Sequence, residues 1–244
     1  MAGNWKMYKT PAETTPFFQK FRPLVENSGH CEIVVCPSFL SLAAAVEAAK
    51  GSAIRVGAQN VAWAKEGAFT GEVSAPMIRA AGATHVIVGH SERRQYFGET
   101  DETVLKRTQA ALECGLSPIV CVGECLEDRE CDRTEAILER QCLQGIAGLT
   151  AHQFANIAIA YEPVWAIGTG KTATPEIAAA AHRAIRAMAA AKYGKQASSS
   201  LRILYGGSVK PDNVQSLMAQ PEIDGALVGG ASLDPVSFAS IVNF

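Results

Sequence analysis

Short apolar segments recur along the whole chain, with room for a helix between each pair. They are rich in β-branched residues and continuously apolar, which is typical of strands buried on both faces of a parallel sheet. They lie at residues 32–36, 54–59, 85–89, 117–123, 156–162, 201–207 and 225–230. Residues 1–5 can supply an eighth, very short strand, because a helical pattern follows within ten residues.

Stretches with helical periodicity separate these segments. They lie at residues 11–27, 40–50, 101–114, 127–146, 175–193 and 211–219. Thr174 followed by Pro175, and Thr100 followed by Thr103, have the chemistry of helix starts. The chain therefore predicts alternating strands and helices.

Eight such units without a Pro/Gly/Ser-rich linker predict a closed (β/α)8 barrel that forms one domain over residues 1–244, a length that such barrels commonly have. An open doubly wound sheet is the rival fold, but it normally has a glycine-rich turn after its first strand. The first two turns of this chain, at residues 4–6 and 37–39, contain no glycine.

Charge and cysteine content exclude several kinds of protein. The net charge is −2, without a block of Lys or Arg, so nucleic-acid binding is not expected. We expect no membrane association either, since no run of eighteen apolar residues and no signal peptide is present, and we expect a cytoplasmic location. The seven cysteines are expected to be reduced. Cys121, Cys125 and Cys131 lack the spacing of a zinc site, so no metal site is predicted.

In a parallel barrel the reactive groups lie at the carboxyl ends of the strands and in the loops that follow. This rule selects a set of polar and glycine residues that should form one ring. The set is Asn4, Lys6, Gln59, Asn60, His90, Ser91, Glu92, Glu124, Glu162, Gly206, Gly207, Ser208, Gly229 and Gly230.

Five motifs in this ring, in order along nearly the whole chain, resemble the triosephosphate isomerase family. They lie at residues 2–7 (AGNWKM), 88–94 (VGHSERR), 160–172 (AYEPVWAIGTGKT), 205–209 (YGGSV) and 225–233 (GALVGGASL). The resemblance implies a (β/α)8 TIM barrel. It also implies an isomerase of glycolysis and gluconeogenesis that interconverts dihydroxyacetone phosphate and D-glyceraldehyde 3-phosphate through an enediolate. Such a reaction needs a base, a group that polarises the carbonyl and a phosphate site.

The resemblance assigns these roles residue by residue. Glu162 matches the catalytic base, and exclusion of water is expected to raise its proton affinity. His90 matches a neutral histidine that donates a hydrogen bond to the substrate oxygens, and Lys6 matches the cation that stabilises the enediolate and binds substrate. The substrate-binding residues, including those of the phosphate site, are expected to be Asn4, Lys6, Gly168, Ser208, Gly229 and Gly230.

Several neighbours of these residues are given smaller roles. Ile167 and Leu227 match apolar residues over the base, and Cys121 matches a position near it, where packing is the favoured role. Glu92 is interpreted as a partner of Lys6, although a minor role in proton transfer stays open. The segment 163–172 is expected to form a lid.

The resemblance also implies partners. The loop from Ala64 to Val73 matches one that inserts into a second subunit near Asn4 and Lys6, so a homodimer is expected. Neither a metal nor an organic cofactor is expected, because Lys6, His90 and backbone donors supply the charge stabilisation. Relatives have several apolar residues before the AGNWKM motif. The first strand is therefore expected to be short and to leave neighbouring strands with missing ladder partners.

Three other functions agree less well with the sequence. Residues 168–172 (GTGKT) resemble part of a nucleotide-binding P-loop, but Trp165 stands where the motif needs its first glycine. A silent phosphate-binding or scaffold protein is disfavoured because Lys6, His90 and Glu162 are all present. The third alternative is an isomerase that acts on another phosphorylated sugar. The short lid disfavours bulky sugars as substrates.

Overall fold

The computed structural model, described here for residues 1–167 and 172–244, contains a closed barrel of parallel strands in the order of the sequence. Its strands are β1 (Ala2–Asn4), β2 (Val34–Cys36), β3 (Arg55–Ala58), β4 (His85–Val88), β5 (Ser117–Val122), β6 (Ala158–Tyr161), β7 (Arg202–Tyr205) and β8 (Gly225–Val228). The predicted (β/α)8 TIM barrel is confirmed, and each strand lies within a segment expected to form one.

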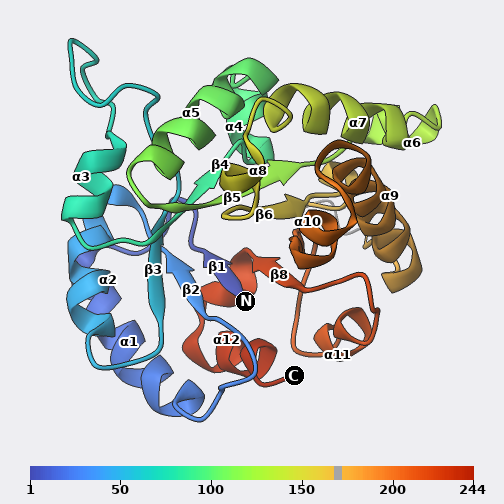
Figure 1. Ribbon diagram of the computed structural model, residues 1–244. Coiled ribbons are helices and arrows are strands. Elements are labelled where there is room, and N and C mark those ends of the chain that lie inside the picture. Colours follow the sequence, from blue (N-terminus) through green and yellow to red (C-terminus); the bar gives the residue numbers. More distant parts are fainter. Residues whose placement is uncertain (168–171) are drawn as a thin grey trace.

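Helices surround the strands (Figure 1). They are α1 (Pro11–Val25), α2 (Leu42–Ala49), α3 (Ala75–Ala80), α4 (Ser91–Tyr96), α5 (Asp101–Glu113), α6 (Leu126–Glu130), α7 (Thr134–Gly145), α8 (Ala151–Phe154), α9 (Pro175–Tyr193), α10 (Lys195–Ser200), α11 (Val214–Met218) and α12 (Pro235–Val242), with the 3-10 turns η1 (Phe39–Ser41), η2 (Val164–Ala166) and η3 (Gly230–Leu233). Both predicted caps are present, because Thr100 and Thr174 accept hydrogen bonds from the backbone N–H groups of Thr103 and Ile177.

One expected helix is divided. The pattern at 127–146 predicts a single helix, whereas the structure has α6 and α7 separated by a short turn. Asp132 in that turn has φ of 54°, a left-handed conformation that a continuous helix cannot contain.

The first strand closes the barrel between β2 and β8. All three residues of β1 pair with β2, and Ala2 and Gly3 also pair with Leu227 and Val228 of β8. The strand is short, as predicted. At the start of β8, Gly225 and Ala226 have no partner in β1, but the expectation that β2 also lacks ladder partners is wrong. Val34, the first residue of β2, pairs with Ala2 and donates its backbone N–H to the carbonyl of Met1 at 2.9 Å.

The core has two parts. Small and branched side chains fill the barrel interior, and they come from Ala2, Val34, Cys36, Ile87, Ile119, Cys121, Ala160, Leu204 and Leu227. A larger apolar cluster includes residues of both the strands and the helices, among them Trp5, Phe18 and Phe21. Within the described ranges, no helix is long and apolar enough to cross a membrane.

Candidate active site

The carboxyl ends of the strands bring the predicted residues to one cavity of about 540 Å³. Asn4 ends β1, His90 follows β4 after Gly89, Glu162 comes directly after β6, and two glycine-containing loops follow β7 and β8. The lining includes seven of the eight predicted site residues: Asn4, Lys6, His90, Glu162, Ser208, Gly229 and Gly230. The eighth, Gly168, lies outside the described residues.

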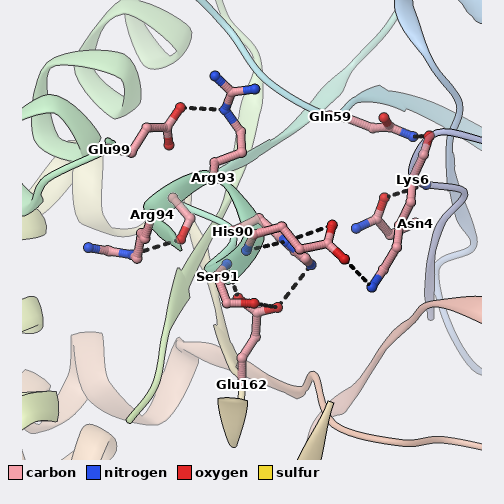
Figure 2. A network of polar contacts seen from close by, with 11 residues as sticks. Asn4, Lys6, Gln59, His90, Ser91, Arg93, Arg94, Glu99 and Glu162 are labelled. Carbon is pink, nitrogen blue, oxygen red and sulfur yellow. Dashed lines mark hydrogen bonds and ion pairs between the residues drawn. The ribbon is translucent and has the colours of Figure 1, made fainter. Parts of the chain in front are cut away.

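Glu162 is buried and held by three donors (Figure 2). One carboxylate oxygen, Oε2, accepts the backbone N–H of Ser91 at 2.9 Å. The other, Oε1, lies 3.2 Å from the Ser91 hydroxyl and 2.9 Å from Nε2 of His90. The Glu162 carboxylate is therefore held against the start of α4.

These donors decide the protonation of Glu162. Burial alone raises the pKa of a carboxyl, as expected from the sequence, but His90 and Ser91 together outweigh it and bring the pKa of Glu162 below its ordinary value. The expectation of a raised proton affinity is wrong for this geometry. Turning away from Ser91 and His90 would remove the groups that stabilise the carboxylate, so the same side chain would become a stronger base.

His90 caps α4 and faces Glu162. Its Nδ1 accepts the backbone N–H of Glu92 at 3.3 Å, a contact that favours a ring with its proton on Nε2. Burial lowers the pKa of His90, but Glu162 and then Glu92 raise it, and the net direction is upward. Glu162 is the largest of the raising influences, so a carboxylate that turns toward substrate leaves His90 closer to the neutral state.

Lys6 follows β1 in a strained backbone conformation. Its φ of 52° is left-handed, which is uncommon for a residue with a side chain. The amide of Gln59 donates to the carbonyl of Lys6 at 2.8 Å, and Asn4 Oδ1 accepts the Lys6 backbone N–H at 3.0 Å. The ammonium lies 2.6 Å from Glu92 Oε1, as expected from the sequence. The cation is thus held at the cavity wall by both backbone and side chain.

The loop after β7 leaves no room for side chains at its two glycines, whereas the loop after β8 has ordinary space at Gly229 and open space at Gly230. A Cβ on Gly206 would lie 2.9 Å from Cγ of Glu162, and one on Gly207 would lie 2.3 Å from the hydroxyl oxygen of Tyr205. At Gly229 it would lie 3.5 Å from Cε of Lys6. Glycine lets the backbone approach an anion closely in such loops. These loops and Lys6 line the same cavity as Glu162.

Comparison with known proteins agrees with this geometry. The family model described as triosephosphate isomerase matches residues 1–244. The chain belongs to the triosephosphate isomerase family. It catalyses the interconversion of dihydroxyacetone phosphate and D-glyceraldehyde 3-phosphate, an isomerisation of glycolysis.

Individual triosephosphate isomerases show how close the relationship is. The chain is 76% identical to the triosephosphate isomerase of Solibacter usitatus (strain Ellin6076), covering 100% of this chain and 98% of that relative. It is 57% identical to the triosephosphate isomerase of Citrifermentans bemidjiense, covering 100% and 97%. A crystal structure of triosephosphate isomerase from Bartonella henselae matches with a TM-score of 0.90 at 38% identity, covering 100% and 97%.

Sequence reasoning gave no role to two residues that touch the triosephosphate isomerase machinery. Ser91 holds Glu162, and Gln59 holds the backbone of Lys6. Both belong to the ring expected at the carboxyl ends of the strands, but that position gives no signal for the groups they contact. Cys121 is fully buried, and burial, followed by the nearby Glu162, raises the pKa of its thiol well above the ordinary value. In the described part of the chain, no group of three His, Cys, Asp or Glu side chains is placed to hold a metal ion.

A second cavity, of about 870 Å³, is also lined by Glu162. Its lining includes Ser91, Gly123 and Glu162 together with side chains of α7. Glu162 lines both cavities, whereas Gly123 and α7 line only the second. We call this second space the rear cavity.

Proposed function

We propose that Glu162 is the base that removes a proton from the carbon beside the carbonyl of dihydroxyacetone phosphate and returns it to the neighbouring carbon. The electron pair of the broken C–H bond forms a C=C bond and the π pair of the carbonyl moves to its oxygen, giving an enediolate. The remaining hydroxyl proton passes from the C1 oxygen to the C2 oxygen before the neighbouring carbon is protonated. The observation that carries the proposal is the 2.9 Å contact between Glu162 and His90 in a cavity that Lys6 also lines. The carboxylate and the two groups suited to polarise an oxygen thus meet at one place.

His90 and Lys6 stabilise the charge that develops on the substrate oxygens. With Nδ1 occupied by the Glu92 N–H, Nε2 is the ring nitrogen available to donate a hydrogen bond. The Lys6 ammonium adds a positive charge, and Asn4 adds a neutral donor beside it. These groups act while Glu162 moves the proton.

The loops after β7 and β8 bind the phosphate through Ser208, Gly229 and Gly230. Support comes from the cavity lining and, for the loop of Ser208, from the lack of space for side chains at the neighbouring Gly206 and Gly207. Gly168 is included in the proposed phosphate site only because its motif resembles that of the triosephosphate isomerase family. The cavity of about 540 Å³ has room for a small phosphorylated sugar.

We further propose a homodimer formed through the loop from Ala64 to Val73. This loop projects from the barrel between β3 and α3 (Figure 1), and Phe69 on it is exposed. Met7 is 94% exposed just after Lys6, and the large side chains of Tyr8 and Tyr96 are also exposed. Exposed apolar surface of this kind is typical of an interface.

Two further proposals concern the domain organisation and the cellular location. One domain over residues 1–244 is supported by a barrel in which β1 pairs with β8, so that both ends of the chain contribute to it. A cytoplasmic location is supported by the seven free cysteines, since reduced thiols are typical of that compartment.

The proposal is tested by mixing the protein with D-glyceraldehyde 3-phosphate and following the formation of dihydroxyacetone phosphate. We expect turnover that Glu162→Gln, His90→Gln and Lys6→Met each lower severely. Activity should persist after treatment with a chelator. Full activity in the Glu162→Gln variant would refute the assignment of the base.

A further inference from the structure

The backbone around Glu162 is hydrogen-bonded to the end of β5 and the residues that follow it. The Glu162 N–H donates to the Val122 carbonyl at 2.7 Å, and the Val164 N–H donates to the Glu124 carbonyl at 3.1 Å. Gly123 lies between these two contacts. A Cβ on Gly123 would lie 1.7 Å from the carbonyl oxygen of Glu162, so the two backbones touch with no space for even a methyl group. Any shift of Gly123 is therefore transmitted to Glu162.

Gly123 is held from the outer layer of the barrel by one side chain of α7. The side-chain Oε1 of Gln141 accepts the Gly123 N–H at 2.7 Å, and its Nε2 donates to the Gly123 carbonyl at 3.0 Å. Gln141 is only 5% exposed, which is low for a glutamine. The last residue of β5 is Val122, so these two bonds take the place of a strand ladder at Gly123.

The hydrogen bonds between Gln141 and Gly123 lie beside the rear cavity. Gly123 and Gln141 both line that space of about 870 Å³, so the Gly123 segment borders a cavity although its backbone packs tightly against that of Glu162. Hydrogen bonds to Gln141 restrain the segment where packing is incomplete. Neither residue lines the substrate cavity.

We propose that Gln141 is a positioning residue for Glu162, acting through Gly123. This inference rests on the proposed role of Glu162 as the base. A carboxylate displaced by a fraction of an ångström would still bind substrate in the same cavity but would transfer the proton more slowly. Loss of the Gln141 contacts therefore lowers kcat and leaves KM nearly unchanged.

The amide chemistry of Gln141 allows a sharp test with Gln141→Glu. A protonated carboxyl has one donor and one acceptor and reproduces both bonds to Gly123, whereas a carboxylate has no donor for the Gly123 carbonyl. Burial raises the pKa of such a carboxyl, so the protonated form persists at low pH and is lost as pH rises. The matched control is Gln144→Glu, the same change at an exposed position one turn later on α7 that lines the same cavity.

The experiment measures kcat and KM of wild type and both variants from pH 6 to pH 9, with the melting temperature followed at each pH. We expect the kcat of Gln141→Glu, divided by that of wild type, to fall on the order of tenfold as pH rises, with KM changing less than about twofold. The ratio for Gln144→Glu should stay constant. A constant ratio for Gln141→Glu as well would overturn the proposal.

A second variant covers the case in which the ionised side chain unfolds the protein. Gln141→Met has a similar length but can make neither bond to Gly123. Its kcat should fall on the order of tenfold to a hundredfold with KM almost unchanged, at a temperature where the variant is fully folded. A lower melting temperature with an unchanged kcat would show that Gln141 is only structural. If Glu162→Gln proves fully active, the proposed function fails, independently of these results.

Discussion

Shortening Glu162 to aspartate tests the base by distance alone. Glu162→Asp keeps the charge but withdraws the carboxylate by one C–C bond, about 1.5 Å. In the structure its oxygens lie 2.9 Å from the Ser91 N–H nitrogen and 2.9 Å from His90 Nε2. Withdrawal takes both contacts beyond hydrogen-bond distance unless the backbone moves, and Gly123 packs too tightly against that backbone to let it move freely.

The expected loss follows from that displacement. A misplacement of about 1 Å at a reacting group can cost on the order of a hundredfold in rate, which corresponds to about 2.7 kcal/mol of activation free energy. Lys6 and the loops proposed to bind the phosphate are unchanged by the substitution. KM should therefore change much less than kcat.

Steady-state kinetics in both directions, each coupled to a dehydrogenase, give kcat and KM for Glu162→Asp. Glu176→Asp on the exposed face of α9 is the control, and it should match wild type. Melting curves verify that both variants are folded. An unchanged kcat for Glu162→Asp, or a loss confined to KM, would refute the reasoning.

Three further predictions concern pH and assembly. Burial lowers the pKa of His182 to about 4, so below about pH 6.5 the unfolded chain binds a proton at this residue that the folded chain does not. The free energy of unfolding, measured in urea, should therefore fall by about 2 kcal/mol between pH 7.5 and pH 5. The His182→Gln variant should show a smaller fall. Equal losses would contradict this. Glu162→Gln should lower the pKa of His90, measured by ¹⁵N NMR, because Glu162 raises it; an unchanged pKa would contradict the pairing. Sedimentation at micromolar protein should give twice the chain mass of 25.8 kDa, and a monomer alone would reject the homodimer.

The fold was predictable because local pattern and global architecture agree. Continuous apolar strands and intervening helices admit few topologies, and each observed strand lies within its predicted segment. The division between α6 and α7 was not predictable from periodicity. It depends on the left-handed conformation of Asp132, for which the helical pattern gives no signal.

The sequence predicted which residues meet at the candidate site but not which of their atoms are in contact. Asn4, Lys6, His90 and Glu162 meet because the carboxyl ends of parallel strands lie at one end of a barrel. Which atoms touch depends on register between distant parts of the chain. Ser91 and Glu162 are 71 residues apart, and sequence pattern alone could not show that their contacts lower the pKa of Glu162.

Deuterium exchange into the substrate tests the central claim most directly. Dihydroxyacetone phosphate is incubated with the protein in D₂O, and ¹H NMR follows the loss of the C1 proton signal, which reports proton removal itself. Wild type should introduce deuterium at C1 at a rate comparable with turnover, whereas Glu162→Gln should introduce almost none. Exchange at the wild-type rate in folded Glu162→Gln would contradict the account, because another group would then be removing the proton.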